Sequence, residues 1–187
     1  MTMNGGEVVV ETLKSHGVDT VFFVPGGTYV TVLEALSRNQ DAIRAVPTRL
    51  ESSAVFAADA YGAIRKRPAC VICSRAPGAS NAVIGIHTAM QGSRPVVLII
   101  ANIPRHLKGR EAFQEIDYRR MYAPVAKAVF DVNSFQEVGE VMARALDISV
   151  SGRPGPVVVA ISMDILDGDT GTPPIPGPPA PVRMGPD

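Results

Sequence analysis

The chain has 187 residues, 46% hydrophobic and 19% charged, and its 18 basic and 18 acidic side chains balance to a formal net charge of zero. This length suits one domain, and without a block of like charge nothing favours binding to nucleic acid or anionic lipid. No apolar run reaches the ~20 residues of a membrane span, and residues 1–6 lack the features of a signal peptide, so we expect a cytoplasmic protein.

Helices and strands alternate along most of the chain. The strands are mostly continuous apolar runs, as in a parallel sheet covered on both faces; we expect them at 20–24, 43–47, 69–73, 95–101, 126–130 and 156–161. Helices with an apolar side are expected over 4–17, 29–37, 51–65, 82–91 and 134–150. Such βαβ units predict a three-layer α/β/α domain with a six-stranded, mostly parallel sheet.

Two helix starts, apart from that at Glu51, carry the spacing of a capping box, in which a side chain at each end of the first turn bonds the other's backbone. They are Asn4 with Glu7, and Ser134 with Glu137. At the other end of the chain, composition changes. We assign residues 1–166 to the domain and read residues 167–187, which are rich in Pro and Gly, as an extended linker toward a domain that this chain lacks.

Cys70 and Cys73 have the C-x-x-C spacing of redox and metal sites. They lie in one predicted strand, where residues three apart face opposite ways, so two reduced core cysteines are the better interpretation. The histidines, His16, His87 and His106, are scattered, and no metal site is expected. We expect His16 at the surface near a helix end and His87 packed within an apolar helix.

Three strand-to-helix turns converge on the carboxyl edge of the sheet, where ligands bind in open α/β folds. They are Pro25-Gly26-Gly27, Thr48 to Glu51, and Pro77 to Asn81. Glycine lets a backbone come close to a flat ligand, although short loops also favour it on steric grounds alone. The sequence has no phosphate-binding glycine motif and no serine nucleophile elbow.

Glu51 is the acidic residue of these turns and lies in the first turn of its helix. Thr48 and Glu51 have the T-x-x-E spacing of a capping box, in which the glutamate would accept the backbone N–H of Thr48. From the local pattern alone, this structural interpretation is favoured over a catalytic one.

A series of short segments between Glu7 and Ile165 follows a recognisable order. They are Gly17-Val18, Val21-Phe22, Pro25-Gly26-Gly27, Glu51 with Ala58, Tyr61 and Gly62, Pro77-Gly78-Ala79-Ser80-Asn81, Ser93-Arg94-Pro95-Val96-Val97, Ala112-Phe113-Gln114-Glu115 and Ser151-Gly152-Arg153-Pro154-Gly155-Pro156-Val157. The set resembles the N-terminal, pyrimidine-binding domain of thiamine-diphosphate enzymes, and most of all the acetolactate synthase group.

The resemblance implies a catalytic role for Glu51, which reverses the local interpretation. The matching glutamate of that family hydrogen-bonds N1′ of the cofactor's aminopyrimidine and so favours the imino tautomer, which removes the C2 proton of the thiazolium. The resemblance also implies that Pro25, Gly26 and Gly27 form a wall of the pyrimidine pocket. It implies that Pro77 and Asn81 lie near the cofactor or a domain interface. Phe113 and Gln114 match residues that face the substrate side from the partner subunit.

The resemblance also implies a thiamine-diphosphate-dependent 2-oxo-acid decarboxylase or carboligase of which this chain holds half an active site. Family members bind the diphosphate and Mg²⁺ through a G-D-G…N motif in a second domain, whereas Gly168-Asp169 is followed by Thr170-Gly171. We therefore expect an inactive chain when alone, a diphosphate-binding domain of the same or another chain as partner, and a homodimer. FAD in a longer protein is left open.

Two alternatives remain beside this interpretation. One is a natural small subunit of a split sulfopyruvate- or phosphonopyruvate-type decarboxylase, and the other is a non-catalytic binding or assembly module of the same fold. Departures from the family pattern bear on this choice: Leu50 replaces a polar residue before the glutamate, Phe23 replaces a glycine, and Arg75-Ala76 replaces Ser-Gly. They put the identity of the substrate in question.

Overall fold

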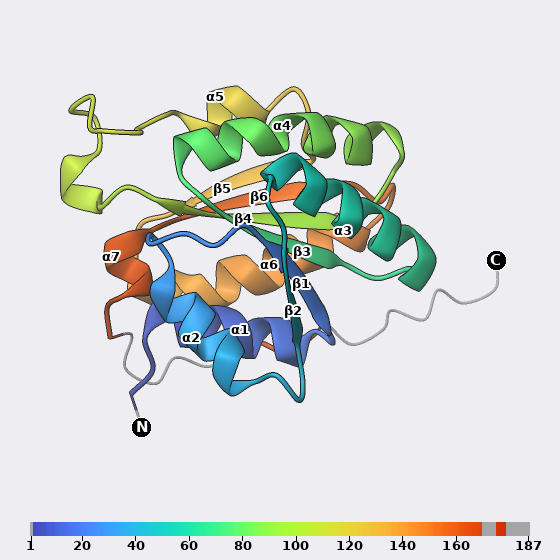
Figure 1. Cartoon of the computed structure of the whole chain (residues 1–187), viewed down its shortest axis with the longest axis horizontal. Coiled ribbons are helices and arrows are strands. Elements are labelled where there is room, and N and C mark those ends of the chain that lie inside the picture. Colours follow the sequence, from blue (N-terminus) through green and yellow to red (C-terminus); the bar gives the residue numbers. More distant parts are fainter. Residues whose placement is uncertain (1, 170–174, 179–187) are drawn as a thin grey trace.

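The computed structural model describes residues 2–169 and 175–178 and is built on a six-stranded sheet (Figure 1). The strands are β1 Thr20–Phe23, β2 Arg44–Pro47, β3 Ala69–Ser74, β4 Val96–Asn102, β5 Ala128–Val132 and β6 Val157–Ser162. Their spatial order is β2-β1-β3-β4-β6-β5, and every neighbouring pair is parallel. The predicted six-stranded α/β architecture is confirmed.

Helices cover both faces of this sheet and make the predicted three layers (Figure 1). They are α1 Gly5–Ser15, α2 Val30–Arg38, α3 Glu51–Arg65, α4 Ala76–Gln91, α5 Tyr118–Tyr122, α6 Val138–Val150 and α7 Met163–Leu166, with short 3₁₀ turns at Arg105–Leu107 and Phe135–Glu137. One core packs under α1, α2, α6 and α7, and the other packs under α3, α4 and α5.

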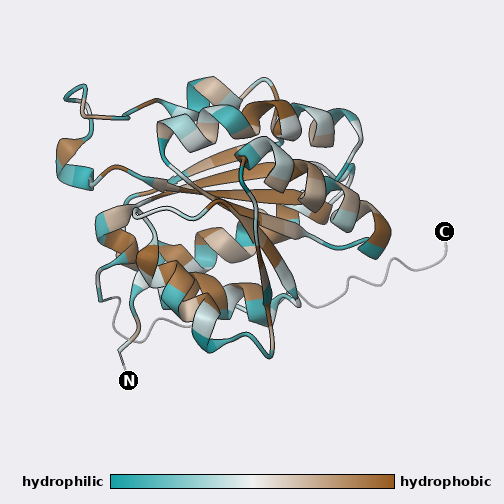
Figure 2. Cartoon of the chain, in the orientation of Figure 1, coloured by the Kyte–Doolittle hydropathy of each residue, from teal (hydrophilic) through white to brown (hydrophobic). Residues whose placement is uncertain are grey.

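The central strands owe their burial to continuous apolar sequence, which Figure 2 shows as a hydrophobic band through the middle of the molecule. In β4 the side chains alternate between faces, so Val97 and Ile99 join the first core while Leu98 and Ile100 join the second. Edge strand β2 is less buried. Strand β4 is apolar along its length because both of its faces are buried, and its polar residue, Asn102, comes at its end.

The two cysteines are free and fully buried, as the sequence predicts. Cys70 packs in the first core and Cys73 in the second, on opposite faces of β3. Burial raises the pKa of the Cys70 thiol to about 12, and burial followed by the negative charge of Glu51 raises the pKa of Cys73.

Helix starts were predicted with mixed success. The Asn4 box is confirmed, because the Asn4 side chain accepts the Glu7 N–H at 2.8 Å and the Glu7 carboxylate accepts the Asn4 N–H at 3.0 Å. The Ser134 box is wrong: Ser134 makes no side-chain cap, and a 3₁₀ turn precedes α6. Helix α4 begins at Ala76, so Pro77 to Asn81 lie in its first turns rather than in a loop.

Both histidine placements differ from expectation. His87 is exposed, because the buried side of α4 is formed by Ala82, Ile86 and Ala89 and the next residue turns outward. The His16 side chain is only 4% exposed and approaches Asp147 of α6 at 4.0 Å.

Part of the predicted linker is described. Ile175 packs against the first core, and the Ser15 hydroxyl donates to the Pro176 carbonyl at 3.0 Å. Residues 170–174 and 179–187 lie outside the described residues, so the division at residue 166 stays a prediction. Among the helices of the described part, none combines the length and apolar character that a membrane crossing requires.

Burial predicts that both thiols are inert in the folded chain. We expect Ellman's reagent at pH 8 to leave native protein unmodified and to modify both cysteines once the chain is unfolded in guanidinium, because a raised pKa and a closed core suppress the thiolate. Rapid modification of native protein, with its circular dichroism intact, would contradict the two-core packing of β3.

Candidate active site

The predicted site turns meet because their strands are neighbours. Strand β1 lies between β2 and β3, and all three run in the same direction. Their carboxyl ends therefore lie side by side and carry the segment Pro25–Gly27, the segment Thr48–Glu51 and the start of α4. The structure brings these three parts of the chain together, as predicted from the order of the elements.

Glu51 is the first residue of α3 and is 8% exposed. The capping-box interpretation is wrong, because the residue before the helix is Leu50, in extended conformation, and makes no side-chain cap. The Thr48 hydroxyl instead donates to carbonyl oxygens, at 3.3 Å from Phe23 and 3.1 Å from Leu50. The Glu51 carboxyl is therefore free of Thr48 and lies where the partial positive charge of a helix N-terminus favours an anion.

Helix α4 holds this carboxyl from the neighbouring strand. Asn81 Nδ2 donates to Glu51 Oε2 at 3.0 Å. Gly78, one turn earlier, lies against the other oxygen, since a Cβ built at Gly78 would be 2.8 Å from Oε1. Within the described residues, Oε1 accepts no hydrogen bond from the protein, so one oxygen is fixed and the other can accept a donor from outside the chain.

The β1 turn forms a second close approach. A Cβ built at Gly26 would lie 2.2 Å from Ser74 Oγ, at the end of β3, so a larger residue there would have to displace the Ser74 hydroxyl. Thr28 Oγ1 donates to the same Ser74 Oγ at 3.3 Å. Pro25 and Gly27 are exposed, and a Cβ at Gly27 would meet open space. Of the predicted wall residues, Gly26 is thus the one whose lack of a side chain is required by packing.

The groups around Glu51 are held uncharged. Tyr29 is fully buried and its hydroxyl donates to the Val24 carbonyl. Burial, followed by the electrostatic effect of the Cys73 and Glu51 side chains, raises the pKa of Tyr29. Sequence reasoning missed Tyr29, Cys73 and Ser74 as neighbours of the site. Cys73 and Ser74 end β3, and Tyr29 directly precedes α2 after the β1 turn, so their place at the carboxyl edge of the sheet is the signal that could have found them.

The departures from the family pattern lie around this site. Leu50 is 45% exposed beside Glu51, and Phe23 ends β1 and is partly buried. Arg75 is the residue before α4, and its Nε atom is buried without a hydrogen-bond partner in the described part of the chain. The site therefore has two apolar side chains, Phe23 and Leu50, and one cationic side chain, Arg75, at these departures from the family pattern.

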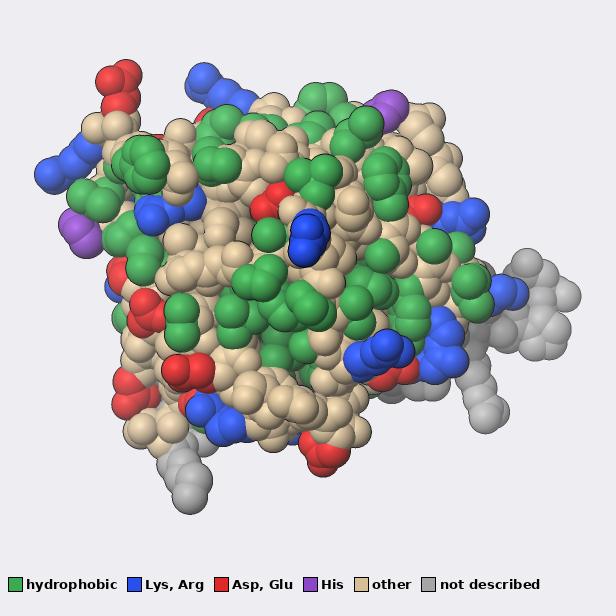
Figure 3. Space-filling view, viewed as in Figure 1, with side chains coloured by type: hydrophobic (Ala, Val, Ile, Leu, Met, Phe, Trp, Pro, Cys, Tyr) green, Lys and Arg blue, Asp and Glu red, His purple; other side chains and the backbone are tan. Residues whose placement is uncertain are grey.

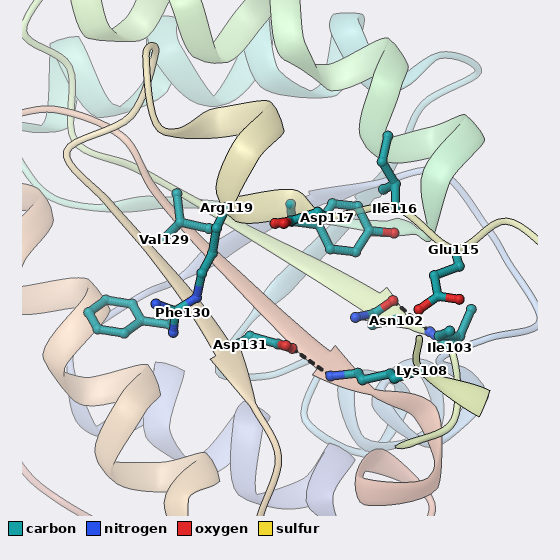
Figure 4. Close-up of a pocket in the computed structure, with 11 residues that line it drawn as sticks. Asn102, Ile103, Lys108, Glu115, Ile116, Asp117, Arg119, Val129, Phe130 and Asp131 are labelled. Carbon is teal, nitrogen blue, oxygen red and sulfur yellow. Dashed lines mark hydrogen bonds and ion pairs between the residues drawn. The ribbon is translucent and has the colours of Figure 1, made fainter. Parts of the chain in front are cut away.

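Phe113 and Gln114 do not join the Glu51 cluster. They lie in the loop after β4, and Phe113 is 79% exposed. Under this loop is a cavity of 330 Å³ at the ends of β4 and β5, and its wall includes Asn102, Lys108, Glu115 and Asp131 (Figure 4). On the face with α2 and β2, apolar side chains gather around a groove of 620 Å³ lined by Phe23, Leu33, Leu36 and Ile43 (Figure 3). No cluster of three potential metal ligands occurs in the described residues.

Comparison with known proteins identifies the family of this arrangement. Residues 3–121 match the model described as "Thiamine pyrophosphate enzyme, N-terminal TPP binding domain". The chain is 36% identical over 165 residues to the acetolactate synthase large subunit of Haemophilus influenzae, covering 88% of this chain and 29% of that protein. It is 37% identical over 163 residues to the acetolactate synthase isozyme 2 large subunit of Escherichia coli, covering 87% and 29%.

An archaeal relative gives the same picture. The probable acetolactate synthase large subunit of Methanocaldococcus jannaschii is 34% identical over 167 residues, which are 89% of this chain and 28% of the relative. The chain thus spans only 28–29% of the length of these curated relatives.

The contact between Gly78 and Glu51 predicts that two glycine substitutions differ in their effect on stability. Gly78→Ala should lower the free energy of unfolding by about 1–3 kcal/mol, because the methyl group collides with the Glu51 carboxyl. Gly27→Ala, which points into open space, should stay within about 0.5 kcal/mol. Urea titration measures both. Helix propensity alone favours alanine within a helix, so a more stable Gly78→Ala protein would show that the contact imposes no constraint.

Proposed function

This chain belongs to the thiamine pyrophosphate enzymes, as their N-terminal TPP binding domain, and we propose that Glu51 is the acid with which it activates the cofactor. One observation carries the proposal. Glu51 is 8% exposed at the carboxyl edge of the sheet, with Oε2 held by Asn81 and Oε1 without a protein donor among the described residues. A buried acid with one open acceptor oxygen is what a ring nitrogen needs as a partner.

The residues present fit the pyrimidine half of thiamine diphosphate. The glycines at positions 26 and 78 place no side chain at two points of this edge, which suits the close approach of a flat ring. In this proposal the open oxygen of Glu51 would hold the pyrimidine ring through a shared proton, and Asn81 keeps the carboxyl oriented. The cofactor, when bound, supplies nucleophilic carbon chemistry toward 2-oxo acids.

The proposed activity is that of a 2-oxo-acid decarboxylase or carboligase of the acetolactate synthase type. Because the chain covers 24–29% of its relatives, the Mg²⁺ and diphosphate ligands, and any FAD site, would belong to another domain of the same or another chain. We propose that this chain alone is inactive for that reason and that it works in the cytoplasm. Exposed Phe113 and neighbouring Gln114 would then face the substrate from a partner subunit.

Arg75 supports keeping a second candidate. A guanidinium at the start of α4, without an acidic partner among the described residues, would favour a more acidic 2-oxo acid. That property fits the small subunit of a split sulfopyruvate- or phosphonopyruvate-type decarboxylase. The non-catalytic module is less well supported, because the Asn81 bond to Glu51 holds an acid in a place where packing does not require one.

Replacing the acid tests the proposal most directly. In the enzyme completed by its diphosphate-binding domain, Glu51→Gln should slow C2–H/D exchange of bound thiamine diphosphate by about 10²–10⁴-fold. Gln keeps the shape and can still accept from Asn81, so the stability loss should be at most about 1 kcal/mol. Exchange is followed by NMR, with the exposed Glu34→Gln as a control for loss of charge. Normal exchange in a folded Glu51→Gln enzyme would leave Glu51 without a catalytic role.

We also propose that α3 and α4 carry the surface through which the chain forms a homodimer. Phe56 of α3 and Ile84 of α4 are 41% and 61% exposed, and large exposed apolar side chains on one layer mark an interaction site. The two helices themselves pack closely, since a Cβ at Gly85 would lie 2.5 Å from Val55. A second copy that presents the same layer would bury both side chains about a two-fold axis.

Charge placed on that layer should break the pair. We expect sedimentation velocity at micromolar concentration to show a dimer for the unaltered chain and a monomer for Ile84→Glu, with association weakened by about 100-fold. Val150→Glu on α6, in the opposite layer, is the matched control and should remain dimeric. A monomeric unaltered chain, or equal behaviour of the two variants, would remove α4 from the interface.

A further inference from the structure

The loop between β4 and α5 is fixed to the rest of the domain by charged side chains. Arg105 Nε contacts Asp164 at 2.8 Å, within α7. Lys108 Nζ lies 2.7 Å from the Asp131 carboxylate in β5 (Figure 4). At its far end, Asp117 caps α5 by accepting the Arg120 N–H at 3.0 Å. The loop is therefore anchored on both sides of the segment 109–115.

Within that segment, one carboxylate closes the backbone on itself. Glu115 Oε1 accepts the Gly109 N–H at 2.6 Å, and Oε2 accepts the Ala112 N–H at 3.0 Å. The Glu115 N–H in turn donates to the Ala112 carbonyl at 2.9 Å. We call this set of bonds the Glu115 clasp. It lowers the pKa of the Glu115 carboxyl through the bonds from Gly109 and Ala112, with Lys108 adding a smaller effect.

The backbone inside the clasp is in conformations that need support. Gly109, Glu111 and Gln114 have φ values of 76°, 52° and 68°. The last two are not glycine, and L-residues with side chains visit this left-handed region seldom. Left-handed residues persist when surrounding bonds determine them. The clasp, which spans all three residues, supplies those bonds.

The clasp presents an aromatic side chain to the outside. Phe113 lies between the two bonded ends and is 79% exposed. A large apolar ring that is held outward on a fixed turn loses little conformational freedom when something packs on it. The same turn sets the backbone direction at Gln114 and borders the 330 Å³ cavity, whose wall includes Glu115 itself (Figure 4).

We infer that Glu115 is a positioning residue, whose carboxylate clasp holds the Phe113–Gln114 turn in the orientation that the substrate side of the completed active site requires. The inference rests on the proposed function for what the turn faces, while the clasp itself rests on the hydrogen bonds above. Glutamine cannot replace it, because the clasp needs two acceptor oxygens toward two N–H donors and an amide offers one. Glu115 would touch neither cofactor nor substrate.

The chain contains no tryptophan, which gives a clean probe of the turn. Phe113→Trp places a single indole on it, and time-resolved fluorescence anisotropy reports its nanosecond motion. In this background Glu115→Gln should increase the amplitude of the fast component at least about twofold, because the turn is released. Glu111→Gln removes the same charge from the same loop without touching the clasp, and it should leave the anisotropy decay unchanged. Equal decays before and after Glu115→Gln would overturn the clasp.

The pH dependence gives a second readout. A clasp that lowers the folded pKa of Glu115 is complete above the pKa of about 4.3 of a free glutamate and is lost only as pH falls through the lower folded value. The fast component should therefore stay small down to about pH 4.3 and rise below it, and it should be independent of pH in Glu115→Gln. The charged side chain near the carboxyl is Lys108, which is paired with Asp131, whereas Arg110 acts on the carboxyl through its backbone N–H. Lysine and arginine stay charged at this pH, so a rise that survives in Glu115→Gln would come from a carboxyl other than Glu115 and would overturn the inference.

Kinetics separate positioning from mere stability. In the completed enzyme with native Phe113, Glu115→Gln should lower kcat/KM for the 2-oxo acid by about 10- to 100-fold, while C2–H/D exchange without substrate stays normal. If exchange slowed as much as turnover, Glu115 would be supporting the whole site and the inference would fail. Failure of the proposed function looks different, because Glu51→Gln would then exchange normally while the anisotropy result stood.

Discussion

The parallel order β2-β1-β3 is the constraint on which the candidate site depends. Because three neighbouring strands end at one edge, Glu51 after β2 and Asn81 in the helix after β3 come within 3.0 Å although 30 residues separate them in sequence. The hydrogen bond between them requires both helices to begin at their observed positions. A shift of α4 by one residue would turn Asn81 by about 100° around the helix and remove it from the carboxyl.

The same geometry explains which glycines the site cannot do without. Gly78 lets α4 pass against the Glu51 carboxyl, and Gly26 lets the β1 turn pass against Ser74. Around the acid, Tyr29 and Cys73 stay neutral because burial, with the nearby negative charge, raises their pKa values. Among the described residues, no cation lies within ion-pair distance of the Glu51 carboxyl. Within the protein the carboxyl is held by the Asn81 amide and lies at the N-terminus of α3, which leaves its other oxygen open to an incoming ring nitrogen.

Most of this fold follows from sequence, and the failures have physical causes. Continuous apolar runs mark the central strands β3, β4 and β6, and α3 begins at Glu51 as predicted. The T-x-x-E pattern at Thr48 gave a wrong prediction. The spacing does not show which residue precedes the helix, and in the structure that residue is Leu50 rather than Thr48. By composition, Pro77 and Gly78 favour a loop. Proline has no backbone N–H to donate, but the first turn of a helix does not use that N–H, so both residues can lie in α4. The contact with Glu51 that makes glycine necessary there lies across the sheet edge, where no local pattern can show it.

The two functional regions are stabilised in different ways, and this difference has a consequence. The Glu51 site is formed by helix starts that pack on the core, so any change that moves it also disturbs the fold. The Phe113 turn lies outside both cores. It is held by the hydrogen bonds of the Glu115 carboxylate and by the ion pairs of Arg105 and Lys108. Residues in such a loop can change with little effect on stability. Activation of the cofactor would then be tied to the core of this domain, while the choice of substrate could vary through the loop after β4 and through Arg75 at the start of α4.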